Sequence, residues 1–266
     1  MIKILIKRLF HNKTLELHVT DHCNLNCKSC SHYAPVADEF YISLEKLEEY
    51  YNNIKNRGLI FFSTLRLMGG EPLLHPYITE IIELSRTYFS DINIVLISNG
   101  IIIKKMSQKF WDVCQRNNII ISITKYPINI NYNELMTFVK NKNIQMTFYG
   151  DNIIPNFRHI VLDDQGKQNP FKNYFICYCG GIYLQLREGK IYSCSQSAYI
   201  SIINKRFGME FKHENNDYLL LNQIKSIKEI KKYIFKPKSF CRYCNLKMTT
   251  WNNQWEMSKR QKSEWL

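Results

Sequence analysis

The sequence has no hydrophobic run long enough to cross a membrane or to form the core of a signal peptide. Its first residues, MIKILIKRLFHNKTLEL, contain an apolar run of only three residues between lysines, whereas a membrane span needs about 20. Internal repeats and long low-complexity segments are also lacking. These absences argue against a membrane span and a repeat array, and we expect a cytoplasmic protein with no membrane partner.

A dense block of basic residues is missing too, although the chain is basic overall. Lysine and arginine number 36 against 23 acidic residues, a formal net charge of +13. Because the lysines are scattered among Asn and Ile, the charge favours a solvated basic surface, with an anionic, phosphorylated small substrate as the alternative. Transfer RNA is an alternative on charge alone, but we expect no nucleic-acid partner because no recognised RNA-binding segment is present.

The first part of the chain alternates β-rich and helical runs. Apolar residues make up 45% of the sequence, enough for one large α/β domain with a small appendage. We predict strands at 15–20, 64–68, 92–98, 119–124 and 144–149, and helices at 43–56, 76–89, 105–117 and 133–142. About five βα units predict a parallel sheet in an open or partial barrel, with catalytic groups at the C-terminal ends of its strands.

The pattern changes after about residue 155. Two β-rich runs, IYLQL and IYSC, flank a turn at Glu188 and Gly189 and predict a β-hairpin. The segment WNNQWEMSKRQKSEW reads as an amphipathic helix that packs back on the domain. A domain boundary is expected between Asn156 and Phe175.

Cysteine usage indicates metal binding. Nine cysteines are an odd number, and clusters of cysteine in a chain without an export signal favour a metal over disulfides. Cys23, Cys27 and Cys30 stand in CNLNCKSC, on a loop after the first predicted strand. Thiolates at this spacing suit an iron–sulfur cluster with one open iron, and a zinc site is the alternative reading.

Two glycine-containing motifs accompany this triplet, and together they resemble the radical S-adenosylmethionine (SAM) superfamily. MGGEP follows the second predicted strand and ISNG follows the third. The resemblance implies a partial (β/α)6 TIM-like barrel over residues 1–160 and a [4Fe-4S] cluster on the triplet that cleaves bound SAM to a 5′-deoxyadenosyl radical. It implies SAM contacts from Gly69, Gly70, Glu71, Pro72, Ser98, Asn99 and, more weakly, Ser122. Ser29 replaces the family's usual aromatic residue, so adenine stacking is expected from His32 or Tyr33.

A second cysteine set resembles the auxiliary-cluster module called a twitch domain, a shortened SPASM domain, over residues 161–266. On that resemblance Cys179, Cys194, Cys241 and Cys244 hold a second [4Fe-4S] cluster, and a four-thiolate zinc site is the alternative. Cys177 is left over as a buried residue, an alternative ligand or a hydrogen-atom donor. Cys114 lies in a helical apolar pattern and is expected in the core.

The resemblance extends to radical SAM dehydrogenases that oxidise aminocyclitols. It implies oxidation or epimerisation of a small sugar-like or cyclitol-like molecule, or of its phosphate or nucleotide conjugate. The auxiliary cluster would accept an electron, and flavodoxin or ferredoxin would be the external donor. Modification of a ribosomal peptide or protein is the alternative, which the short segment before the first strand disfavours. A non-enzymatic iron–sulfur or zinc protein would leave the open triplet and GGEP without purpose.

Overall fold

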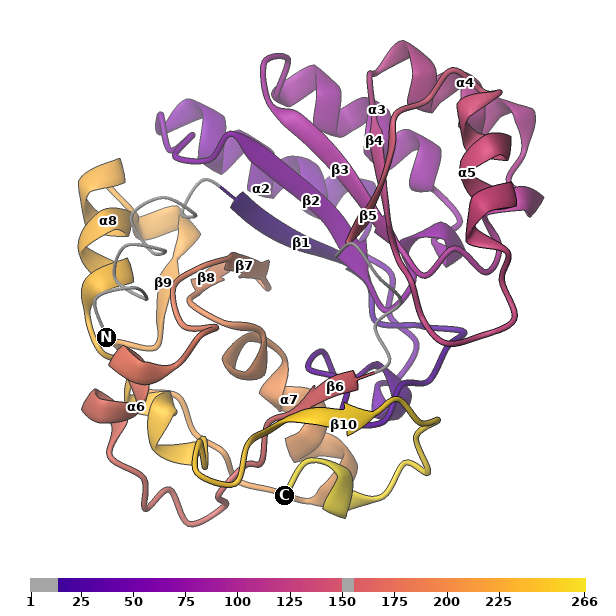
Figure 1. The fold of residues 1–266 in the computed structure, drawn as a ribbon. Helices are drawn as coiled ribbons and strands as arrows, with labels where there is room; N and C mark the ends of the chain where they lie inside the picture. Colours follow the sequence, from indigo (N-terminus) through magenta and orange to yellow (C-terminus); the bar gives the residue numbers. More distant parts are fainter. Residues whose placement is uncertain (1–13, 150–155) are drawn as a thin grey trace.

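The computed structural model describes residues 14–149 and 156–266, so the N-terminal lysine-flanked run lies outside the described residues. Its main sheet begins with five parallel strands, each at a position predicted from the sequence (Figure 1). They are β1 (Thr14–Thr20), β2 (Thr64–Gly69), β3 (Asn93–Ser98), β4 (Ile120–Thr124) and β5 (Met146–Tyr149). The order across the sheet is β5-β4-β3-β2-β1-β7-β8-β9.

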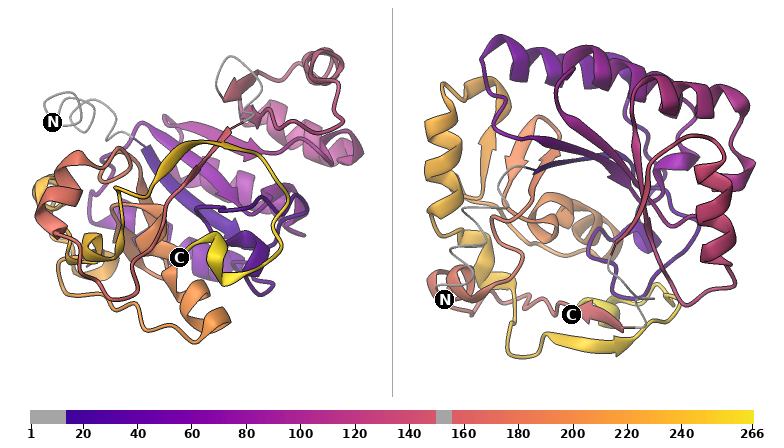
Figure 2. Two further views of the ribbon diagram at one scale, coloured as in Figure 1. Left: turned by 60° about the horizontal axis from the view of Figure 1, so that its bottom comes forward. Right: turned by 45° about the horizontal axis from the view of Figure 1, so that its top comes forward.

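Four helices connect these strands. They are α2 (Leu44–Asn56), α3 (Ile78–Tyr88), α4 (Gln108–Arg116) and α5 (Tyr132–Lys140). Ser43 caps α2 by accepting a hydrogen bond from the Lys46 amide at 3.2 Å, and Ser107 and Asn131 cap α4 and α5 in the same way. The helices lie on the outer side of a curved sheet (Figure 2), so the predicted partial barrel is confirmed, and no closed barrel forms among the described strands.

Strand β1 shows how the sequence sorts side chains between two faces. Alternate residues of a strand point to opposite faces, and Leu15, Leu17 and Val19 join the main hydrophobic core. Glu16 and His18 alternate with them and are also buried. The inner face of the sheet therefore carries buried polar groups, and Cys114 lies in the apolar core as predicted.

The predicted hairpin extends the same sheet. β7 (Leu184–Arg187) pairs with β1 in parallel, and β8 (Lys190–Tyr192) and β9 (Tyr218–Leu220) follow antiparallel. Glu188 and Gly189 both have positive φ, 51° and 69°, as a tight hairpin turn requires. Helices α6 (Pro170–Ile176), α7 (Ser195–Phe207) and α8 (Ile227–Phe235) complete this region. Among the described residues, no helix is long and apolar enough to span a membrane.

The predicted amphipathic helix near the end of the chain is wrong. β10 (Thr250–Gln254) pairs antiparallel with β6 (Asn156–His159), and only Lys262–Glu264 forms a single 3-10 turn, η6. Asn252 and Asn253 weaken a helix, and a neighbouring strand offers the backbone other hydrogen-bond partners. Trp265 is buried as expected and packs against Tyr33 and Phe207.

Candidate active site

The three cysteines of the first set line one cavity of about 490 Å³. They lie on the loop between β1 and the 3-10 helix η1 (Ala34–Val36). Asn26, Ser29 and Tyr33 take the left-handed conformation, with φ between 55° and 58°. This conformation is uncommon outside glycine, and its repeated use bends the loop back on itself. The cysteine loop, residues 23–30, thus turns Cys23, Cys27 and Cys30 toward the same space.

Burial holds these thiols in the protonated form. It raises the pKa of Cys23 to about 12 and also raises the pKa values of Cys27 and Cys30. None of the cysteines forms a disulfide. A metal cluster needs thiolates, so its binding at this loop would release protons and offset the cost of burying charge.

The glycine loop after β2 lies directly against the backbone that leads into the cysteine loop. A Cβ atom on Gly69 would stand 2.2 Å from the Thr20 oxygen, and one on Gly70 would stand 2.3 Å from the His22 oxygen. The Gly70 amide donates to the Thr20 oxygen at 2.8 Å. Both glycines line the cavity. Only glycine therefore allows the loop to pack this closely against the segment before the cysteines, and its backbone faces the cavity.

Glu71 has a different position from the one that the sequence suggested. Its side chain is fully buried, and neither it nor Pro72 lines the cavity. The carboxylate accepts hydrogen bonds from the Leu73 amide at 3.1 Å and the Asn99 amide at 2.8 Å. Burial raises the pKa of Glu71 to about 7. Glu71 therefore ties the glycine loop to the turn after β3.

The turn after β3 reaches the cavity as predicted. Ser98 and Asn99 both line it. The side-chain Nδ2 of Asn99 donates to the side-chain oxygen of Asn24, next to Cys23, at 2.8 Å. Ser122 is buried inside β4 and does not line the cavity, whereas Thr124, at the end of that strand, does. Thr124, and not Ser122, is therefore the β4 residue on the cavity wall.

The aromatic residues near the cysteine loop divide between the cavity and the core. His32 lines the cavity, while Tyr33 is buried in the second hydrophobic core. Tyr126, just beyond β4, also lines the cavity and was missed by the sequence analysis. Of these three rings, His32 and Tyr126 therefore line the cavity, and Tyr33 does not.

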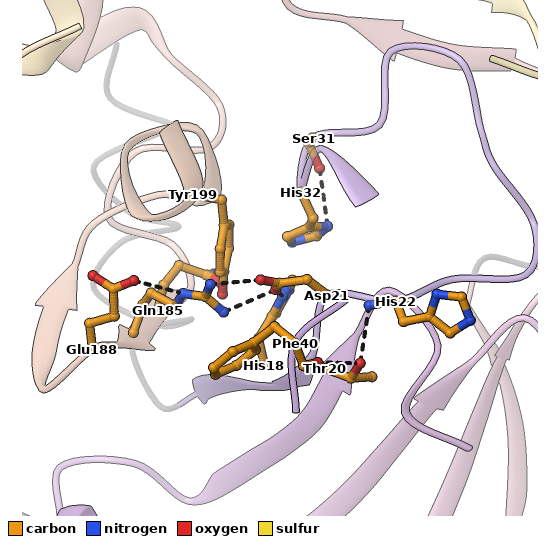
Figure 3. A network of polar contacts seen from close by, with 11 residues as sticks. His18, Thr20, Asp21, His22, Ser31, His32, Phe40, Gln185, Glu188 and Tyr199 are labelled. Atoms are coloured by element: carbon orange, nitrogen blue, oxygen red, sulfur yellow. Dashed lines mark hydrogen bonds and ion pairs between the residues drawn. The ribbon is translucent and has the colours of Figure 1, made fainter. Parts of the chain in front are cut away.

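A buried polar network anchors the start of the cysteine loop (Figure 3). Arg187 of β7 binds the carboxylate of Asp21 through two hydrogen bonds of 2.9 and 2.6 Å. His18 lies 3.5 Å from the same carboxylate and stacks on Tyr199 of α7 with ring centroids 4.0 Å apart. Burial alone would raise the pKa of Asp21, but His18 and Arg187 together hold it below its ordinary value. The network fixes Asp21 two residues before Cys23.

A second polar cluster lies along the cavity wall. Arg66 of β2 donates to Glu16 of β1 at 2.9 Å and stacks over the Tyr183 ring at 4.4 Å. Gln185 of β7 donates to the other Glu16 oxygen and accepts from Tyr199. Glu16, Arg66, Tyr183 and Gln185 all line the cavity. The alternation of Glu16 and His18 in an apolar strand was the signal for this inner polar face.

The second cysteine set surrounds a smaller cavity of about 160 Å³. Its lining includes Cys177, Cys179, Cys194, Cys241 and Cys244. Cys177 directly follows α6, Cys194 precedes α7, and Cys241 and Cys244 lie in and just after the 3-10 helix η5 (Ser239–Tyr243). Asn173 donates to the carbonyl oxygens of Cys241 and Cys244 at 3.0 and 2.6 Å and so fixes their turn.

The two cavities share part of their walls. Cys179 and Cys194 line both of them, whereas Cys177 lines only the smaller one. Tyr33 lies between the cysteine sets: burial raises its pKa, and Cys244, Cys194 and Cys30 raise it further. Its buried hydroxyl has no hydrogen-bond partner among the described residues. Within those residues, no group of three or more His, Cys, Asp or Glu is arranged to hold a metal ion.

Cys177 and Cys179 lie next to each other, because the Cys179 amide donates to the Cys177 sulfur at 3.4 Å, and Arg158 is near both. Burial raises the pKa of Cys244, and the nearby thiols of Cys194 and Cys177 raise it further. Cys177 also contributes to the raised pKa values of Cys194 and Cys241. The Cys179 sulfur instead accepts a hydrogen bond from Arg158.

The site agrees with comparisons to known proteins. A family model described as the Radical SAM superfamily matches residues 17–129. GTP 3′,8-cyclase of Staphylococcus haemolyticus is 30% identical over 146 residues, covering 53% of this chain and 41% of that protein. GTP 3′,8-cyclase of Aliarcobacter butzleri is 32% identical over 101 residues, covering 37% of this chain and 30% of that protein. The matches thus span less than half the length of these relatives.

Among solved structures, BtrN in complex with AdoMet and 2-DOIA resembles the fold with a TM-score of 0.53 and 12% identity. The alignment covers 88% of this chain and 92% of BtrN, and at this identity it shows a shared fold alone. The family implies SAM and a [4Fe-4S] cluster, and the glycine loop and the three thiols on one cavity fit both. Residues 17–129 of this chain therefore resemble the radical SAM superfamily, and the fold of the described residues is similar to that of BtrN.

Proposed function

We propose that this protein oxidises a carbon–hydrogen bond of a small sugar-like or cyclitol-like molecule by radical SAM chemistry. The observation that carries the proposal is the cavity of about 490 Å³, which is lined by thiols of both cysteine sets. A substrate in that cavity would lie between the group that initiates the reaction and a group able to accept an electron. Epimerisation of the same carbon is the nearest alternative.

The chain's own residues supply the binding and orientation. Cys23, Cys27 and Cys30 would hold the first cluster, while Gly69 and Gly70 pack against the backbone before these cysteines and line the cavity in which SAM would bind. When bound, these groups would supply a 5′-deoxyadenosyl radical that removes a hydrogen atom from the substrate carbon; the residues of the second cysteine set would hold a cluster that supplies an acceptor for the electron left when the substrate hydroxyl loses a proton. An external donor such as flavodoxin or ferredoxin would provide the initiating electron.

We propose Cys177, Cys194, Cys241 and Cys244 as the ligands of the second cluster, in place of the set with Cys179. Cys177 lines only the smaller cavity, whereas Cys179 also lines the larger one and its sulfur accepts a hydrogen bond from Arg158. The unpartnered hydroxyl of Tyr33 beside Cys194 and Cys244 would gain an acceptor from a sulfur there. Cys179, on the wall of the larger cavity, then takes over the role of hydrogen-atom donor if the reaction is an epimerisation.

Polar groups along the cavity wall support a substrate rich in hydroxyl or amino groups. The carboxylate of Glu16 is held by Arg66 and Gln185, and Tyr199 fixes Gln185 in turn. A network whose members orient one another is preorganised to bind polar groups without rearrangement. The shared fold with BtrN, which was crystallised with AdoMet and 2-DOIA, supports the same substrate class.

GTP is the second candidate substrate. The relatives named GTP 3′,8-cyclase and the net charge of +13 favour it. The discriminating experiment incubates anaerobically reconstituted protein with SAM, a reductant and either deuterated aminocyclitols and sugars or GTP. The proposal predicts deuterium in 5′-deoxyadenosine and a cyclitol or sugar product that has lost one deuterium from carbon and one proton from its hydroxyl. A cyclised GTP product, or a cyclitol isomer that carries hydrogen in place of the abstracted deuterium, would replace oxidation with the corresponding alternative.

A matched pair of variants tests the ligand assignment. Cys177→Ala is expected to lose about four of about eight irons, since one thiolate of a closed [4Fe-4S] site is gone. Cys179→Ala is expected to keep them. The reverse pattern would restore Cys179 to the ligand set.

A further inference from the structure

A segment near the end of the chain runs along the cysteine loop. We call residues 255–265 the strap; it lies beside the loop that follows β1 (Figures 1 and 2). Met257 forms an antiparallel bridge with Cys27. The Lys28 amide donates to the Glu256 oxygen at 2.9 Å, and the Ser258 amide donates to the Asn26 oxygen at 2.8 Å. These backbone contacts hold the strap in a fixed register against the cysteines.

Trp255, at the start of the strap, reaches a ligand sulfur. Its indole Nε1 donates to the Sγ atom of Cys27 at 3.3 Å. Trp265, at the other end of the strap, instead donates to the carbonyl oxygen of Cys30 at 3.0 Å. The two tryptophans therefore make contacts of different kinds with neighbouring cysteines, one with sulfur and one with the backbone.

A hydrogen bond to a cluster thiolate acts on the charge of the cluster. Reduction adds negative charge that is shared by the sulfur ligands, so an N–H donor stabilises the reduced form more than the oxidised form. Partners of metal ligands also fix their orientation. Cys27 is buried, and burial strengthens such an interaction because water does not compete for the sulfur.

We propose that Trp255 is a positioning residue of the catalytic cluster, which orients the Cys27 thiolate and raises the cluster's reduction potential through its indole N–H. The strap thereby couples the region after the barrel to the step that starts the radical reaction. The inference rests on cluster binding by Cys23, Cys27 and Cys30 alone. It does not depend on the substrate or on a second cluster, so its failure would leave the oxidation proposal standing.

The test compares Trp255→Phe with Trp265→Phe in the reconstituted full-length protein. The midpoint potential of the cluster is followed by electron paramagnetic resonance, using the reduced signal that changes when SAM is added. Trp255→Phe keeps a ring in place but removes the donor to sulfur, and we expect a shift to more negative potential. A tenfold change in the reduction equilibrium would correspond to about 59 mV for one electron. Trp265→Phe removes a donor to a carbonyl oxygen and is expected to leave the potential unchanged.

A measurement on the unsubstituted protein tests the proposal even if Trp255→Phe does not fold. Protein labelled with indole-¹⁵N tryptophan should show a ¹⁵N coupling to the SAM-responsive reduced cluster, and this coupling should persist in Trp265→Phe. An unchanged potential in an iron-replete Trp255→Phe protein, an equal shift in both variants, or no ¹⁵N coupling would overturn the proposal.

Discussion

Replacing Arg187 with methionine removes the cation that pairs with Asp21 below the cysteine loop. Asp21 is 4% exposed and receives two hydrogen bonds from Arg187. Removing one partner of a buried pair leaves an uncompensated charge and costs about 3–5 kcal/mol. For a chain of this size, that loss corresponds to a fall in Tm of roughly 10 °C. Because Asp21 precedes Cys23 by two residues, iron loading of the first cluster should also fall.

The assay is anaerobic urea unfolding at pH 7, followed by circular dichroism, together with iron content after reconstitution. The pKa of Asp21 is lowered in the folded protein, so its pairing stabilises the fold above the ordinary pKa of 3.8 and is lost as pH falls through the folded value. At pH 7 the full effect is present. Lys205→Met is the control, since the Lys205–Asp38 pair is 79% and 71% exposed and its loss should cost less than about 1 kcal/mol. Equal effects of the two substitutions would refute the anchoring role.

Three further outcomes follow from the site. Gly70→Ala should weaken SAM binding at least about tenfold, measured by equilibrium dialysis, because the added Cβ would overlap the His22 carbonyl. Gly58→Ala is the control: this position is open, with φ of 61°, and the substitution should leave SAM binding intact. The pKa of Glu71 is raised to about 7, so the free energy of unfolding should fall by up to about 3 kcal/mol as pH rises from 4.5 to 7. Urea unfolding of Glu71→Gln should lack this pH dependence. The same pH dependence in wild type and variant would contradict the raised pKa of Glu71. Glu16→Gln should raise KM more than it lowers kcat, and an effect confined to kcat would remove Glu16 from substrate binding.

The sequence alone predicted those features whose pattern lies in residues close together along the chain. The cysteine triplet, Gly69, Gly70 and the Ser98–Asn99 turn each follow a strand end, and a parallel sheet gathers such ends at one edge. The alternation within LELHVT placed Leu15 and Leu17 in the core. Fold class and the cysteine loop could therefore be predicted without a structure.

Contacts between distant residues left no such signal. Asp21 and Arg187 are 166 positions apart, and Cys27 and Trp255 are 228 apart. The spacing of the tryptophans suggested a helix, but pairing with β6 outweighed that local preference. Side-chain direction at a turn was equally hidden, so Glu71 was expected to face SAM although its carboxylate binds backbone amides.

The central claim is that one cavity joins two iron–sulfur clusters, and metal analysis tests it most directly. Iron and zinc contents and Mössbauer spectra would be compared for the reconstituted wild type and for the variant in which Cys23, Cys27 and Cys30 are alanine. Two [4Fe-4S] clusters predict about eight irons per chain, falling to about four in the variant. About four irons with one zinc would contradict the electron-accepting cluster and leave a redox-neutral radical reaction in its place.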